Sequence, residues 1–255
     1  MKKWFILSLI CISSLMLLAS IAFAQPQSNP NGPWIEDNQN VSLSSVMTNA
    51  ELYKTLEKIQ SVSKGRMTLE IAGYSDALNG DLMEEAGYPL YVAKFGQADP
   101  DKKRVLITSQ IHGNEVLGTE AAVELMQQLA AGGNQVDEIL DNVSIWFMPR
   151  INPDGAMHQS DGQWHPIRQC SQLWDPKAIG LPEGTNAPWY YNSRYEGYDE
   201  NRDYNPNLDF RVDNYPAEEV AAFLNDRTVN NSVYGGFYVT PEARIVTKVF
   251  KEMDP

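Results

Sequence analysis

Short apolar runs alternate with a helical pattern in the middle of this 255-residue chain, and this alternation limits the folds open to it. Four runs are typical of strands: residues 67–73, 90–95, 104–111 and 143–151. Between the last two, residues 115–131 have helical spacing, and Gly132 and Gly133 end that helix. Strands that alternate with helices predict an α/β fold, in which helices flank a mixed, mostly parallel central sheet.

The third run and the helix after it allow more detailed predictions. Residues 105–107 are continuously apolar, which is typical of a central strand covered on both faces. In the helix, one stripe contains Leu117, Ala121, Leu125 and Leu129, and we expect it to face the core. Further helices are expected over residues 48–62, with Thr48 or Asn49 as the cap, over 217–224 and over 241–253.

The first 24 residues have the pattern of a secretory signal peptide. Lys2 and Lys3 precede an apolar run over residues 4–21, and residues 22–24 (Ala-Phe-Ala) form a cleavage site. An uncleaved membrane anchor is the alternative, since the run is just long enough to span a bilayer. We expect a secreted or periplasmic protein without a stable membrane anchor, in which residues 25–47 form a linker and 48–255 the domain.

Charge and cysteine content exclude several classes of function. The net charge of the chain is −13, and loss of two lysines with the signal peptide makes it −15. An acidic exported protein is a poor candidate for binding nucleic acid or anionic membranes. Of the two cysteines, Cys11 leaves with the signal peptide, so Cys170 has no internal disulfide partner. We interpret Cys170 as a packed or surface thiol without a catalytic role.

A histidine and a carboxylate follow the third strand in the stretch Ser109–Glu115, SQIHGNE. The carboxyl end of a strand is where open α/β sheets bind ligands. A sharp turn at Gly113 would aim His112 and Glu115 at one point, where an imidazole and a carboxylate suit a zinc ion. Glu115 in the first helical turn would also be favoured by the helix dipole. Alternatively, Glu115 only caps the helix and His112 is an interior histidine.

Residues 152–215 show no regular pattern, and long irregular stretches inside compact domains are usually functional. The segment begins with Asn-Pro-Asp-Gly, four residues that favour a turn. It also contains residues 194–203, RYEGYDENRD. In an acidic chain, two arginines and an asparagine there suggest a receptor for a carboxylate. Alternatively, Arg194 and Arg202 only pair with the acidic residues of the same stretch.

Taken in order, the motifs HGNE, NPDG and GYDENRD resemble the zinc carboxypeptidase family, the carboxypeptidase A-like metallopeptidases. The resemblance runs from about Thr48 to Pro255. It implies a three-layer α/β sandwich and an exported zinc metallocarboxypeptidase that hydrolyses C-terminal peptide bonds with metal-activated water. The expected cofactor is Zn²⁺, and the expected partner is a peptide or peptide-like substrate with a free C-terminal carboxylate. We expect a monomer.

The resemblance also implies roles for individual residues. His112 and Glu115 match two zinc ligands, and Asn201 and Arg202 match the pair that binds the substrate's terminal carboxylate. Arg194 matches the arginine that stabilises the oxyanion, and Arg168 is the alternative.

In the family, the next strand supplies the third zinc ligand and the glutamate base comes further on, whereas this chain stops at Pro255, before that strand. We do not expect His158 or His165 to replace the third ligand. The fold is thus expected to be incomplete at the C-terminus, and the chain to bind zinc weakly and hydrolyse nothing. Two alternatives stay open: a non-catalytic carboxylate- or peptide-binding module, and an amidohydrolase of the same superfamily.

Overall fold

The computed structural model describes residues 46–77, 81–228 and 231–255. These belong to one compact unit, Leu43–Pro255. The predicted signal peptide and nearly all of the predicted linker lie outside the described residues, so both stay predictions. None of the helices in the described part of the chain is long and apolar enough to cross a membrane.

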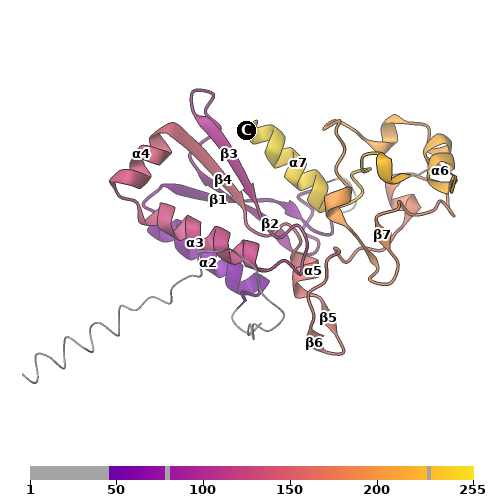
Figure 1. Cartoon of the computed structure of the whole chain (residues 1–255), viewed down its shortest axis with the longest axis horizontal. Coiled ribbons are helices and arrows are strands. Elements are labelled where there is room, and N and C mark those ends of the chain that lie inside the picture. Colours follow the sequence, from indigo (N-terminus) through magenta and orange to yellow (C-terminus); the bar gives the residue numbers. More distant parts are fainter. Residues whose placement is uncertain (1–45, 78–80, 229–230) are drawn as a thin grey trace, which may run out of the picture. The chain divides into compact units, whose positions relative to one another are not determined.

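A four-stranded mixed sheet forms the centre of the described fold (Figure 1). Its strands are β1 (Met67–Tyr74), β2 (Pro89–Phe95), β3 (Lys103–Thr108) and β4 (Val143–Met148). They lie in the order β1-β2-β4-β3. The mixed sheet is confirmed, but β1/β2 and β2/β4 are antiparallel and only β3/β4 is parallel in this sheet. Parallel pairing follows from the helical crossover between β3 and β4.

Strand β3 is at the edge of the described sheet, which makes the prediction of a central position wrong there. Its apolar run has another cause: the partly buried Leu106 and Ile107 contact hydrophobic clusters on opposite faces of the sheet, whereas Val105 is 42% exposed. The strand also ends at Thr108, earlier than expected, because Gln110 has a left-handed backbone with φ of +50°.

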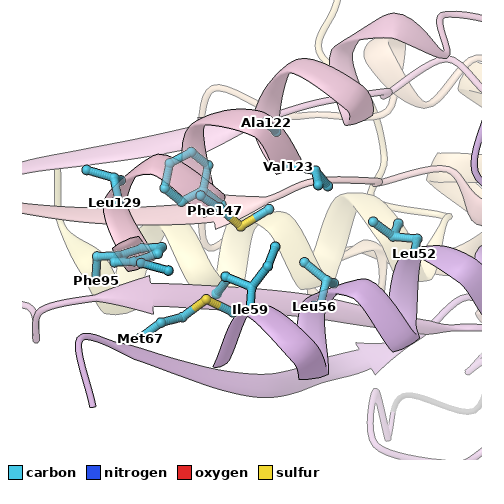
Figure 2. Packing of buried hydrophobic residues seen from close by; sticks show 12 residues of the cluster. Leu52, Leu56, Ile59, Met67, Phe95, Ala122, Val123, Leu129 and Phe147 are labelled. Atoms are coloured by element: carbon cyan, nitrogen blue, oxygen red, sulfur yellow. The ribbon is translucent and has the colours of Figure 1, made fainter. Parts of the chain in front are cut away.

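One face of the sheet is covered by helices α2 (Asn49–Val62) and α3 (Leu117–Ala131) (Figure 2). Buried side chains of both helices pack there on three strands; the labelled ones are Leu52, Leu56, Ile59, Met67, Phe95, Ala122, Val123, Leu129 and Phe147. Because strand side chains alternate between faces, Phe95 and Phe147 lie on this side while Trp146 and Met148 lie on the other.

Helix α7 (Pro241–Met253) covers the opposite face, so the described unit has three layers (Figure 1). Its Ile245 and Val249 pack in the same cluster as Trp146. The buried Lys94 reinforces this layer, since its ammonium binds Glu70 at 2.7 Å and Glu252 at 2.8 Å. Lys94 therefore joins β1, β2 and the end of α7.

The first helix begins as predicted, and the third does not. Thr48 caps α2 through a capping box with Glu51, which decides between the two expected caps. Helix α3 begins at Leu117, so Glu115 precedes it and is not in its first turn. The predicted stripe is also displaced, because Leu125 is 39% exposed while Ala122, Val123 and Met126 are buried.

The second half of the chain consists mainly of short elements, which the missing periodicity predicted for residues 152–215. They are α4 (Asn134–Asn142), α5 (Pro153–Met157), β5 (Gln159–Ser160), β6 (Gln163–Trp164), η2 (Pro176–Ile179), β7 (Tyr191–Asn192), β8 (Gly197–Tyr198), η3 (Glu200–Arg202), η4 (Val212–Asn214), α6 (Ala217–Asn225) and η5 (Asn231–Val233). Two small apolar clusters hold this region together, one around Tyr190 and Tyr198 and the other around Leu181 and Leu224.

A pair of leucine substitutions tests the assignment of the core. Leu56→Ala removes a fully buried side chain and should lower the free energy of unfolding by about 2–5 kcal/mol. Leu173 is 67% exposed, and Leu173→Ala should change it by less than about 0.5 kcal/mol. Urea unfolding of both variants measures the difference, and equal effects would contradict the core described here.

Candidate active site

The turn after β3 is fixed by a buried glutamine in a strained backbone conformation. Gln110 is 4% exposed and has a positive φ, which non-glycine residues adopt at a cost. Its side chain donates to the Gly113 carbonyl at 2.7 Å and accepts hydrogen bonds from Arg150 and Thr119. These three bonds connect the turn to Gly113, Thr119 and Arg150, so they fix the position of His112 within it.

Two sequence motifs meet at a contact between glycines. A Cβ on Gly113 would lie 2.2 Å from the Gly155 carbonyl carbon, so only glycine fits at position 113. Asn152 begins the second motif and caps α5 by accepting a hydrogen bond from the Gly155 amide at 2.6 Å. Its amide group donates to the Arg168 carbonyl at 3.2 Å. The HGNE turn, the NPDG turn and residue 168 thus form one connected unit.

His112 and Glu115 converge as the sequence predicts. The Nδ1 atom of His112 lies 2.7 Å from Oε1 of Glu115, and the imidazole is almost fully buried. On the other side of the ring, Nε2 lies 3.2 Å from Oδ1 of Asp199. Each ring nitrogen thus faces a carboxylate. In the tautomer with the proton on Nε2, that nitrogen donates to Asp199, and the Nδ1 lone pair on the Glu115 side is available to a metal.

Arg168, and not Arg194, contacts the partners of His112. Its Nε lies 3.0 Å from Oδ2 of Asp199, and its Nη1 lies 3.8 Å from Oε1 of Glu115. Arg194 instead stacks over the Tyr195 ring at 5.5 Å. Of the two arginines that the sequence left open, only Arg168 therefore lies beside the carboxylates that flank His112.

Asn201 and Arg202 are exposed and belong to η3, which directly follows Asp199. Arg202 donates to the Asn201 carbonyl at 2.9 Å. The structure brings these two residues near the His112 pair only through Asp199, two positions before Asn201. Sequence reasoning missed Asp199, which it treated only as a possible partner for an arginine.

Comparison with known proteins identifies the family. A family model described as zinc carboxypeptidase matches residues 52–252. This chain belongs to the zinc carboxypeptidase family. The resemblance predicted from the three motifs is therefore confirmed.

Individual relatives agree with this assignment. Carboxypeptidase B of Astacus astacus is 28% identical over 111 residues, which are 39% of this chain and 37% of the relative. The catalytic chain of Homo sapiens carboxypeptidase N is 26% identical over 160 residues, which are 58% of this chain and 32% of the relative. The chain thus spans about a third of the length of these curated relatives.

Solved structures support the fold class. Carboxypeptidase A from Helicoverpa armigera superposes with a TM-score of 0.52 at 16% identity, covering 84% of this chain and 44% of the other. Thrombin-activatable fibrinolysis inhibitor gives a TM-score of 0.50 at 17% identity, covering 81% of this chain and 44% of the other. At these identities the match concerns the fold alone, and it confirms the predicted carboxypeptidase-like α/β sandwich.

The donor set around His112 suits zinc but is not complete among the described residues. An imidazole nitrogen and a carboxylate oxygen are both ordinary zinc donors, and Asp199 supplies the outer carboxylate that such histidines usually have. Within the described ranges, no further histidine, cysteine or carboxylate has a ligand atom within 4.8 Å of both. His158 instead uses Nδ1 to donate to the His165 carbonyl oxygen, at 3.1 Å.

The NPDG turn also contains a perturbed carboxyl group. Burial raises the pKa of Asp154 to about 6, against a hydrogen bond from Ser75 that lowers it, and the negative charge of Asp76 adds to the increase. One of its oxygens, Oδ2, has no hydrogen-bond partner among the described residues. Asp154 is therefore neutral under mildly acidic conditions, and its ionisation opposes folding.

The stability of the fold should fall as pH rises because of Asp154. Below pH 3.8 the carboxyl is protonated in both states, and between 3.8 and about 6 only the unfolded state ionises. Wild type should lose on the order of 3 kcal/mol over this window from this group, and Asp154→Asn should lack that loss. Denaturant unfolding at pH 4 and pH 7 measures it; parallel pH profiles for the two proteins would contradict the assignment.

Proposed function

We propose that this chain supplies the zinc-binding and carboxylate-binding residues of an exported zinc metallocarboxypeptidase, an enzyme that acts on peptides with a free C-terminal carboxylate. The observation that carries the proposal is the 2.7 Å convergence of His112 Nδ1 and Glu115, with Asp199 on the opposite ring nitrogen. Membership of the zinc carboxypeptidase family supports it. Export is tested by measuring the intact mass of the protein from its natural source. The mass should correspond to a chain that begins at Gln25.

In this proposal His112 and Glu115 hold the zinc ion, and Asp199 keeps the imidazole in the correct tautomer. When bound, zinc polarises the scissile carbonyl and lowers the pKa of a coordinated water to about 7. Arg168 or Arg194 stabilises the oxyanion. Arg168 is better placed, since its guanidinium already lies beside Glu115 and Asp199. Asn201 and Arg202 bind the terminal carboxylate through charge-assisted hydrogen bonds.

Because the described residues bring together two zinc donors and no third, we expect the 255-residue chain to bind zinc only weakly at His112. For the same reason we expect it not to hydrolyse peptides.

The zinc prediction concerns the part of the affinity that depends on His112. It is the zinc binding that calorimetric titration detects in wild type and not in His112→Ala. Its dissociation constant should be above about 1 μM, because two donors hold zinc poorly. Asp199→Asn should weaken it further by about 10- to 100-fold, since the tautomer is no longer fixed. Tight binding that disappears in His112→Ala would show that a third donor is present.

Peptide binding tests the carboxylate receptor independently of catalysis. Arg202→Ala should weaken binding of a short peptide with a free C-terminus by about 10- to 100-fold, because charge-assisted hydrogen bonds contribute about 1.5–3 kcal/mol. The matched control is Arg211→Ala, which removes an exposed arginine paired with Asp213. Fluorescence anisotropy with the free-acid and amidated peptides measures the effect. Equal affinity for both peptides would contradict the proposal.

One outcome favours the alternative function. If the protein isolated from its natural source binds the free-acid peptide through Arg202 but neither binds zinc at His112 nor cleaves the peptide, the protein is a carboxylate-binding module. The exposure of Asn201 and Arg202 is compatible with this.

A further inference from the structure

We propose that Cys170, Glu200 and Glu242 form a second metal site, for zinc or a similar thiophilic divalent cation, distinct from the His112–Glu115 pair. This inference does not rest on the proposed peptidase function. It concerns a cluster that the candidate active site does not use.

The three side chains converge from separate parts of the chain. Cys170 lies in the irregular segment after β6, Glu200 begins η3, and Glu242 is in the first turn of α7. Their ligand atoms all lie within 4.8 Å of one another, and all three residues are fully buried. Tetrahedral zinc with these donors needs ligand atoms roughly 3–4 Å apart, so side-chain movements on the order of 1 Å would complete the site.

Glu200 is the observation that points to a ligand. Neither of its carboxyl oxygens has a hydrogen-bond partner among the described residues, although the residue is 0% exposed. A buried carboxylate without donors is costly, and such groups in native proteins are usually paired or bind a metal. Protonation alone would not satisfy it, because a neutral acid still requires partners for its hydroxyl and its carbonyl.

Asp203, three residues later, shows how the same fold treats a buried carboxylate that needs no cation. Its two oxygens accept four hydrogen bonds, from Tyr190 Oη, Val239 N, Thr240 N and Thr240 Oγ1, at 2.7–2.9 Å. Both residues are fully buried, so the contrast with Glu200 is not a matter of exposure. Glu200 has no such donors among the described residues, which is typical of a carboxylate that binds a cation.

Gln172 offers a fourth donor. Its amide nitrogen donates to both oxygens of Glu242, at 3.1 and 3.2 Å, and to the Ser75 carbonyl at 2.6 Å. Its Oε1 atom is buried and has no partner among the described residues. A cation between Cys170, Glu200 and Glu242 would bind this oxygen or a water molecule as the fourth ligand.

The electrostatics of the cluster agree with a missing positive charge. Burial, and secondly repulsion by Glu242, raises the pKa of Glu200, and the nearby Cys170 thiol offsets only part of this. Asp154 and Asp76 add negative charge around Glu242. A divalent cation relieves this repulsion and deprotonates the thiol that coordinates it. A thiolate with carboxylates selects zinc-like metals over calcium or magnesium, which prefer all-oxygen sites.

A cobalt titration tests the site, because only a thiolate ligand gives a sulfur-to-cobalt charge-transfer band in the near ultraviolet. We expect this band when Co²⁺ is added to the metal-free 255-residue protein. It should persist in His112→Ala and in Cys11→Ser, which removes the only other cysteine, and disappear in Cys170→Ser. Absence of the band in wild type, or its survival in Cys170→Ser, would overturn the proposal.

Glu200→Gln keeps the shape of the side chain and provides a second test if Cys170→Ser does not fold. It should weaken cobalt binding, followed by the same band, at least about tenfold, since even outer-shell partners are worth that much. Glu183→Gln, at an exposed glutamate paired with Lys177, should leave the affinity unchanged. Equal affinities of Glu200→Gln and Glu183→Gln would show that Glu200 is not a ligand and would overturn the site as proposed.

Discussion

The buried carboxylate of Asp203 joins the candidate active-site loop to the scaffold, and much of the second half of the chain depends on it. It accepts hydrogen bonds from Tyr190 and from the backbone and hydroxyl of Thr240, the residue that caps α7. Burial raises its pKa, so these donors are needed to keep it in place. Because Asp203 is the C-cap residue of η3, the same bonds position Asn201 and Arg202 and, one turn earlier, the Asp199 carboxylate beside His112.

The elements that the sequence predicted well are those whose signal is local. Helix α7 has the predicted bounds, and the capping box of Thr48 and Glu51 begins α2, because both depend on residues a few positions apart. The edge position of β3 was not predictable in this way, since a run of apolar residues does not reveal how many neighbours a strand has. The displaced stripe of α3 shows the same limit, because several registers of that helix are apolar.

In the candidate site, too, local contacts were predictable from the sequence and long-range contacts were not. His112 and Glu115 are three residues apart, so their convergence follows from one turn. Asp199 approaches His112 across 87 positions, and Arg168 approaches Asp199 across 31, through a segment without periodicity. Contacts of this kind arise from the path of an irregular chain, for which composition and spacing contain little information. The buried Glu200 next to Asp199 belongs to the same category.

The contact between Gly113 and Gly155 has a consequence for how this protein can diverge. Each glycine lies in a different motif. The Gly155 backbone occupies the space that a side chain on Gly113 would need, and a Cβ on Gly155 would lie 2.4 Å from the Gln169 carbonyl oxygen. Neither position can therefore accept a larger residue, and no change at Gly155 would make room at Gly113, since glycine is already the smallest residue. Substitutions in the site are therefore confined to the surrounding loops, and the distance between the two turns stays the same when those loops change.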